Sequence, residues 1–198
     1  MSRLLIWRHG ETSWNASGRV QGHADIDLSD VGREQAATAA TRLAALGPTT
    51  IVSSDLRRAH DTASVLAAVT GLPVSTDPRL KERFYGPWQG LTMGEIAERW
   101  PEEQARWRAG ESSIGLGIES LDDLAKRAVA AFTDAVSAAT GGLVVVVTHG
   151  GTARQGCAAM LGWSDSAMRT LCGLANCHWT ELRFDPARGW RLWSHNTL

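Results

Sequence analysis

Histidine and arginine side chains follow closely on three apolar stretches of this chain. The three places are Arg8-His9-Gly10 after residues 4–7, Arg58 after residues 50–53, and His149-Gly150 after residues 143–148. The planar guanidinium group of arginine matches phosphate oxygens, and a neutral imidazole can attack phosphorus to form a covalent intermediate. A second imidazole can donate hydrogen bonds to the phosphoryl oxygens. These residue types predict an anion pocket with a histidine nucleophile or base inside it.

Other catalytic patterns are missing from the sequence. It contains no glycine-rich Lys-Ser/Thr loop of the nucleotide-binding kind, no HExxH motif and no carboxylate cluster that would hold a metal ion. Cys157, Cys172 and Cys177 lie at spacings that complete no zinc ligand set, even though His178 follows the last of them. A metal site is therefore not expected.

Short apolar stretches alternate with segments of helical periodicity along the chain. Strands are predicted for residues 4–7, 50–53, 72–75 and 143–148, and helices for residues 31–46, 56–69, 92–100, 102–108, 121–138 and 152–161. This alternation is typical of a three-layer α/β/α sandwich with a mostly parallel central sheet. The carboxyl ends of parallel strands meet at one edge, where ligands bind, so His9, Arg58 and His149 are expected to converge there.

The chain ends in two further predicted strands, residues 178–184 and 190–195, joined by the turn-forming residues 185–189. This hairpin is expected to add an antiparallel edge to the sheet. Pro73 favours an edge position for the strand at residues 72–75. Residues 14–27 lack periodicity and are predicted as loop. The whole chain, residues 1–198, is interpreted as a single domain.

The composition excludes several classes of protein. A formal net charge of -1 gives no basic field for nucleic acid or for an anionic membrane surface. The longest apolar run, residues 143–147, is far too short to cross a membrane. An odd number of cysteines at these spacings argues against a disulfide framework and suits a reducing compartment. A soluble protein of the cytoplasm is the expectation.

Several motifs occur in an order that resembles a known family. They are Arg8-His9-Gly10-Glu11-Thr12 with Trp14-Asn15, Gly18-Arg19 with Gln21-Gly22 and Asp27-Leu28-Ser29, Ser53-Ser54-Asp55-Leu56-Arg57-Arg58-Ala59 with Thr62-Ala63, Leu80-Lys81-Glu82 with Gly86 and Trp88, and Thr148-His149-Gly150-Gly151. Together they cover almost the whole chain. The sequence is similar to the histidine phosphatase superfamily, in its phosphoglycerate mutase-like branch.

The resemblance implies a role for each matching residue. His9 resembles the nucleophile that becomes phosphohistidine, and Glu82 resembles the general acid that later activates water. The other positions implied in the site are Arg8, Arg58 and His149 around the phosphoryl group and Asn15, Gln21, Gly22 and Gly150 in substrate binding. The implied substrate is a small-molecule phosphate ester, and neither a metal nor a dissociable cofactor is implied.

Alternatives within the family stay open. Residues 79–120 are expected to form a small cover over the site that looks shorter than in the glycolytic mutases. A mutase must shield its intermediate from water, so a reduced cover favours a phosphatase over a cofactor-dependent phosphoglycerate mutase. A catalytically silent phospholigand-binding module is the alternative from a different class. Ile118 precedes Glu119-Ser120 where the family often has Gly-Glu-Ser, which bears on how the cover closes.

The resemblance is closest to the actinobacterial glucosyl-3-phosphoglycerate phosphatases. The stretches that support it are residues 51–63 and 88–92, Asn176, and residues 179–182. A broad-specificity phosphomonoesterase is equally compatible with them. The terminal hairpin also offers an edge that a homodimer could use.

Several other residues are interpreted as ordinary structure or surface. Glu11 and Glu119 are rival candidates for the acid. His23, His60, His178 and His195 receive no role, and Arg57 is interpreted as a surface charge of its helix. Arg106, Arg108 and Arg127 are interpreted as solvated surface, with one of them a candidate to reach a charged leaving group. Trp14, Trp88, Phe84 and Tyr85 are candidates to line a substrate pocket.

Overall fold

A six-stranded mixed sheet forms the centre of the molecule in the computed structural model, which describes residues 2–139 and 141–198. The strand order is β3-β2-β4-β1-β5-β6. Their bounds are β1 Arg3–Arg8, β2 Pro48–Ser53, β3 Val74–Thr76, β4 Leu143–Thr148, β5 Trp179–Asp185 and β6 Gly189–Thr197. The pairs among β1 to β4 are parallel, and β5 and β6 join antiparallel. The predicted α/β fold and its antiparallel C-terminal edge are confirmed.

The two central strands, β1 and β4, have unbroken apolar runs at residues 4–7 and 143–147 because both faces of the sheet are covered. In β1, Leu5 and Trp7 pack into one core cluster, while Leu4 and Ile6 pack into another on the opposite face. Side chains of a strand point alternately to the two faces, so a continuous apolar run is required when helices cover both. All residues of β4 are buried for the same reason.

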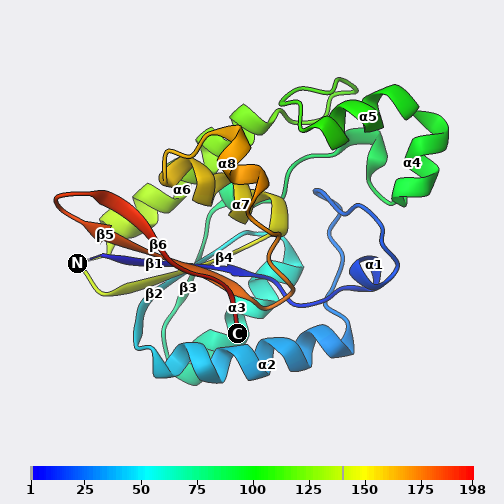
Figure 1. Cartoon of the computed structure of the whole chain (residues 1–198). Helices are drawn as coiled ribbons and strands as arrows, with labels where there is room; N and C mark the ends of the chain where they lie inside the picture. Colours follow the sequence, from blue (N-terminus) through cyan, green and yellow to red (C-terminus); the bar gives the residue numbers. More distant parts are fainter. Residues whose placement is uncertain (1, 140) are drawn as a thin grey trace.

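Helices form the two outer layers. The first core cluster lies under α2 (Asp30–Ala45) and α3 (Arg57–Thr70), and the second lies under α6 (Leu121–Ala138) and α7 (Gly150–Met160). Figure 1 shows α2 and α3 on one side of the sheet, with α6, α7 and the short α8 (Asp165–Arg169) on the other. Ser29 caps α2 by accepting a hydrogen bond from Gly32 N–H.

The segment between β3 and α6 has a small core of its own. It contains two 3₁₀ turns, η1 (Pro78–Leu80) and η2 (Gly86–Trp88), and the helices α4 (Met93–Arg99) and α5 (Pro101–Ala109), which lie beside the end of the sheet in Figure 1. Its fully buried members include Trp88, Ile96 and Ile114, and Ile118 joins them with 6% of its surface exposed. The residue that departs from the family pattern therefore serves as packing for this segment.

One loop prediction is wrong. A short helix, α1 (Ser13–Ala16), overlaps the start of the stretch 14–27 predicted as loop. Thr12 and Asn15 form a capping box, in which each side chain bonds to the backbone N–H of the other. Such reciprocal bonds stabilise a helical turn too short to show periodicity. Within the described residues, no helix has the length and apolarity needed to cross a membrane.

Candidate active site

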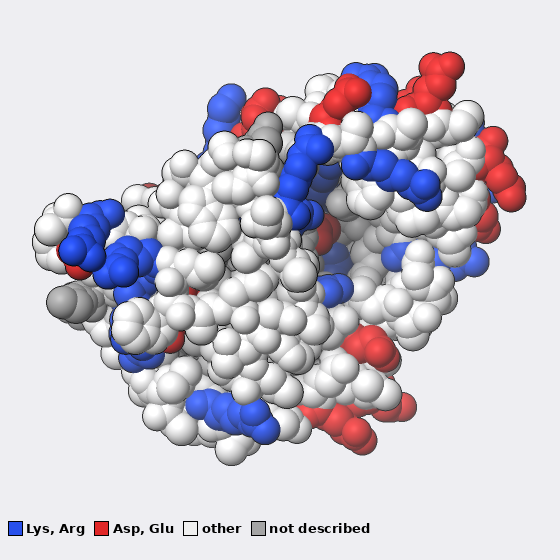
Figure 2. All heavy atoms as spheres, viewed as in Figure 1, with Lys and Arg blue, Asp and Glu red and all other residues white. Residues whose placement is uncertain are grey.

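A cavity of about 150 Å³ opens where β1 ends. Its lining comes from five segments and consists of Arg8, His9, Asn15, Arg19, Val20, Gln21, Gly22, Arg58, Glu82, Tyr85, Trp88, Met93 and Trp107. Figure 2 shows a hollow on this face with Lys and Arg side chains over and inside it. Of the residues to which the resemblance gives a catalytic or binding role, His149 and Gly150 are outside this lining, and both adjoin it. Of the four aromatic candidates, Tyr85 and Trp88 line the cavity, whereas Trp14 and Phe84 do not.

The pairing of β1 with β4 brings the two histidines together. Arg8 lies opposite Thr148 in the parallel register, and His9 N–H donates to the Thr148 carbonyl at 3.0 Å. The next residue of each strand end is a histidine, and their ring centroids are 5.1 Å apart. Both rings are almost completely buried, with His9 exposing 3% of its surface. Residues 140 positions apart in the sequence thus meet because their strands are neighbours.

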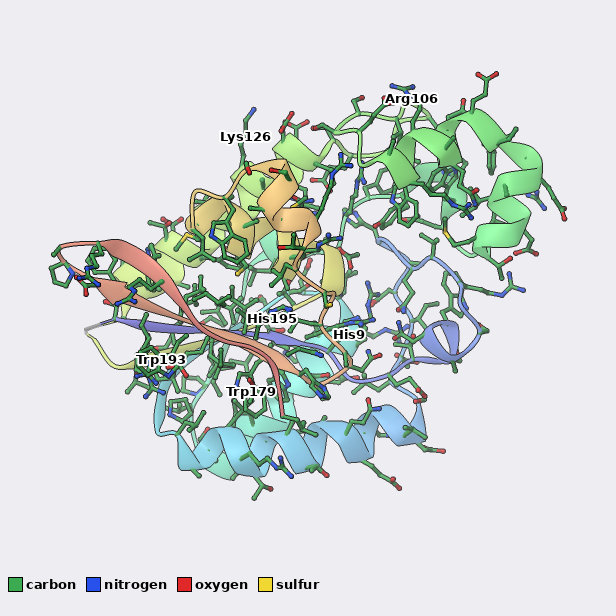
Figure 3. All side chains as sticks on the ribbon, in the orientation of Figure 1. His9, Arg106, Lys126, Trp179, Trp193 and His195 are labelled. Atoms are coloured by element: carbon green, nitrogen blue, oxygen red, sulfur yellow. The ribbon has the colours of Figure 1, made fainter. Side chains whose placement is uncertain are left out.

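One ring nitrogen of His9 carries a lone pair that is available for attack. Figure 3 shows His9 at the end of β1. Its Nδ1 lies 2.7 Å from the Gly10 carbonyl oxygen, which can only accept, so Nδ1 carries the proton and Nε2 carries the lone pair. Burial, together with the charges of Arg58 and Arg8, holds the pKa of His9 well below its ordinary range. His9 is therefore a neutral imidazole with an available lone pair at pH 7.

His149 is oriented by Ser54, a residue of the Arg58 motif to which the family resemblance assigns no role. Its Nε2 lies 2.9 Å from Ser54 Oγ, which also accepts a hydrogen bond from Leu56 N–H. Among the described residues the hydroxyl proton of Ser54 has no other acceptor than Nε2, so His149 carries its proton on Nδ1. Burial, and next the charge of Arg58, lowers the pKa of His149 well below its ordinary range. The ring is a neutral donor through Nδ1.

Two arginines supply positive charge beside the histidines. Arg58 is fully buried, and its Nη atoms donate to the carbonyls of Ala24 and Gly22 at 2.7 and 2.8 Å. Burial lowers its pKa to about 10, so Arg58 remains charged at pH 7. Arg8 donates from Nη1 to the Leu174 carbonyl. The Nε groups of both arginines are buried and have no partner within the described chain.

The loop from Asn15 to Gly22 closes the side of the cavity. Asn15 Oδ1 accepts from Thr12 N–H, which leaves the amide nitrogen of Asn15 for the cavity that it lines. Gly22 has φ +54, and a Cβ built there would lie 2.2 Å from Gln89 Oε1. Glycine adopts this left-handed backbone without strain, and the Gly22 carbonyl in turn accepts from Arg58.

Glu82 is held across the cavity by the start of α7. Its carboxylate accepts from Gly151 N–H at 2.9 Å and from Thr152 N–H at 3.1 Å. Free N–H groups at a helix N-terminus favour an anionic partner. The two rival acids lie elsewhere: Glu119 pairs with Arg127, and the Glu11 carboxylate accepts from Ser29. Neither of them lines the cavity.

Two interpretations of the sequence are corrected by this geometry. Arg127 is not solvated surface, because its side chain is 19% exposed and donates to the carbonyls of Arg79, Lys81 and Glu82. His23 also has a place in the site, since its Nε2 lies 2.8 Å from the Glu82 carbonyl oxygen. Neither could be recognised from periodicity, because each contacts the backbone of a distant loop. Arg57 is a surface charge, as interpreted, and pairs with Asp25 and Asp27.

The sequence and the fold both match known proteins. The model of the family described as "Histidine phosphatase superfamily (branch 1)" matches residues 4–197. Glucosyl-3-phosphoglycerate phosphatase of Mycolicibacterium vanbaalenii is 43% identical over 188 residues, which are 91% of this chain and 83% of that protein. Metal-independent phosphoserine phosphatase of Arabidopsis thaliana is 41% identical over 158 residues, 78% of this chain and 66% of that protein.

A solved structure of mycobacterial glucosyl-3-phosphoglycerate phosphatase with VO3 superposes over all of both chains. The TM-score is 0.93 at 39% sequence identity. The agreement extends from the central sheet to the segment around α4 and α5, since the whole chain is covered. This chain belongs to branch 1 of the histidine phosphatase superfamily and is a phosphatase.

Proposed function

We propose that the chain hydrolyses small phosphate monoesters through a phosphohistidine intermediate on His9. The observation that carries this proposal is the set of buried polar atoms around His9. Arg8 Nε, Arg58 Nε and His149 Nδ1 are all buried without a hydrogen-bond partner in the described chain. Each buried unpaired donor costs about 1–3 kcal/mol. A bound phosphoryl group, with three oxygens to offer, recovers this cost.

In the first step, Nε2 of His9 attacks phosphorus and the bond from phosphorus to the ester oxygen breaks. Arg8, Arg58 and the Nδ1–H of His149 hold the phosphoryl oxygens, with Asn15, Gln21 and Gly22 along the side of the cavity. Glu82, when it carries a proton, donates it to the departing oxygen. General acid catalysis of this kind contributes about 10²- to 10⁴-fold in rate.

In the second step, the Glu82 carboxylate takes a proton from water, and the oxygen of that water attacks phosphorus. The bond from phosphorus to Nε2 breaks and His9 returns to its neutral form. The products are inorganic phosphate and the free alcohol. Gly150, the first residue of α7, adjoins this centre, since a Cβ built on it would lie in ordinary contact with Arg8 Nε at 3.5 Å.

The substrate that the comparisons favour is glucosyl-3-phosphoglycerate. Two observations support it: the 43% identity to a protein of that activity, and the match over the full length of a second one. A broader range of phosphomonoesters is the second candidate, because a plant relative at 41% identity is a phosphoserine phosphatase.

We further propose a domain organisation, a cellular compartment and a dimer surface for the enzyme. Residues 79–120, with their separate core around Trp88 and Ile96, act as a small cover within the single domain 1–198. Three free cysteines, Cys157, Cys172 and Cys177, suit the reducing cytoplasm. The outer edge of β6 is the surface that a homodimer would use.

Replacing the nucleophile tests the proposed reaction. His9→Ala should abolish phosphate release from an aryl phosphate, from glucosyl-3-phosphoglycerate and from sugar phosphates, and a chelator should leave the unmodified enzyme active. His60→Ala is the matched control, because His60 is a surface histidine of α3. Turnover near that of the unmodified enzyme in a His9→Ala variant with native circular dichroism would contradict the nucleophile assignment.

A further inference from the structure

A second cavity of about 330 Å³ adjoins the phosphate pocket. Tyr85 and Trp107 line both of them. Glu82, which lines the first, accepts a hydrogen bond from Gly151, which lines the second. The two cavities therefore meet beside the group that protonates the leaving oxygen. A leaving group that extends from this oxygen toward Tyr85 and Trp107 would reach the residues that the second cavity shares with the first.

The second cavity is rich in unpaired positive charge. Four arginines line it. The Arg83 side chain donates to the carbonyls of Glu119 and Ser112, and among the side chains that the structure describes none of Arg108, Arg154 and Arg169 forms an ion pair with a carboxylate. The only acidic residue in the lining, Glu111, is already paired with Arg106 at 2.7 Å. We call the group Arg108, Arg154 and Arg169 the arginine cluster.

The arginine cluster has N–H donors that the described chain does not use. Arg154 donates from Nη2 to the Met168 carbonyl at 3.2 Å, while its buried Nε has no partner in the described chain. Arg169 extends across Gly110, where a Cβ built on the glycine would lie 2.8 Å from Nη2. Arg108, on α5, is the third arginine of the cluster in the lining. Three guanidinium groups from α5, α7 and α8 thus surround one space.

We propose that the arginine cluster binds a second anionic group of the substrate, carried by the leaving group. This inference rests on the proposed phosphatase reaction and defines the class of substrate: phosphomonoesters with a carboxylate or a second phosphate beyond the scissile ester. The guanidinium fork pairs with either group through two parallel hydrogen bonds. Such contacts add to substrate selectivity, and substrates without the second charge gain nothing from them.

Two substrates that differ in one group test this inference. In 3-phosphoglycerate a carboxylate stands where glycerol 3-phosphate has a hydroxymethyl group. Arg154→Gln and Arg169→Ala should each lower kcat/KM for 3-phosphoglycerate about tenfold, the size expected for one charge-assisted hydrogen bond. The kcat/KM for glycerol 3-phosphate should change less than about twofold. Arg188→Ala, in the exposed turn between β5 and β6, is the control that removes the same charge elsewhere.

Fructose 1,6-bisphosphate against fructose 6-phosphate gives the corresponding test for a second phosphate, and a selective loss in either pair supports the proposal. Equal losses on charged and uncharged substrates, or no loss in either pair, would overturn it.

A binding measurement distinguishes failure of this inference from failure of the proposed reaction. Calorimetry on the His9→Ala variant should give tighter binding of 3-phosphoglycerate than of glycerol 3-phosphate, and equal affinities would refute the cluster's role even if turnover were absent.

Discussion

Ser54 decides which nitrogen of His149 carries the proton. Its hydroxyl lies 2.9 Å from Nε2, and both groups are fully buried. A neutral imidazole donates from one nitrogen and accepts at the other, so the serine proton on Nε2 places the remaining proton on Nδ1. Without the hydroxyl, His149 can adopt the other tautomer and turn an acceptor toward the phosphoryl oxygens.

The Ser54→Ala variant should therefore lower kcat/KM about tenfold, because a buried nitrogen loses its partner and the donor to the substrate is no longer selected. Ser53→Ala is the control, since Ser53 is equally buried but its hydroxyl donates to a backbone carbonyl. Nitrogen NMR of the labelled imidazole reports the tautomer directly. If the nitrogen chemical shifts of the His149 imidazole are the same in Ser54→Ala as in the unmodified enzyme, the prediction is wrong.

At the scale of the elements, the loop that follows η1 is held from two sides. The N-terminus of α7 binds the Glu82 carboxylate, and Arg127 of α6 binds the backbone of the loop at Arg79, Lys81 and Glu82. Arg127 also pairs with Glu119 at 2.6 Å. The position of Glu82 thus depends on contacts with both α6 and α7.

Arg127→Ala should reduce turnover of alkyl phosphates more than turnover of aryl phosphates. A displaced acid matters most when the leaving oxygen is strongly basic, so the ratio of the two rates reports the position of Glu82. We expect the ratio to change about tenfold, which corresponds to about 1.4 kcal/mol. Lys126→Ala is the matched control, because Lys126 is 79% exposed on the same helix and points away from the molecule in Figure 3. Equal slowing of both substrate types would indicate a general loss of structure instead.

At the scale of the whole molecule, burial of the two site histidines makes stability depend on pH. Their pKa values are lowered in the folded state, so below pH 6.5 the unfolded chain binds more protons than the folded one. The free energy of unfolding should then fall as the pH falls from 6.5 to 5.5, by up to about 1.4 kcal/mol per pH unit for each histidine. His23, whose pKa is also lowered, adds to this trend.

Urea unfolding at pH 7.5, 6.5 and 5.5 measures this dependence. Replacing one contributor, as in His9→Gln, should reduce the loss between pH 6.5 and 5.5 by about 1 kcal/mol. Inorganic phosphate is left out of these samples, because a ligand that binds only the folded state would raise its stability. A slope that is the same in both proteins would show that His9 is not protonated on unfolding.

The sequence by itself determined the alternation of strands and helices and the class of chemistry. A buried strand needs an unbroken apolar run, so residues 4–7 and 143–148 could be recognised, and the polar residues after them marked the edge of the sheet. The motifs around His9, Arg58, Glu82 and His149 were enough to indicate the family. The capping box of Thr12 and Asn15 was also present in the sequence, but a single turn has no periodicity to reveal it.

Only the tertiary structure decided how these residues are supported. Ser54 meets His149 across 95 positions of the chain, Arg127 meets the Glu82 loop across 45, and His23 meets it across 59. Contacts between segments so far apart follow from strand order and helix packing, which leave no local pattern in the sequence. The arginine cluster also leaves no local pattern in the sequence. Its three arginines look like ordinary charges of a helix surface, and they form one group because α5, α7 and α8 contribute to the same cavity.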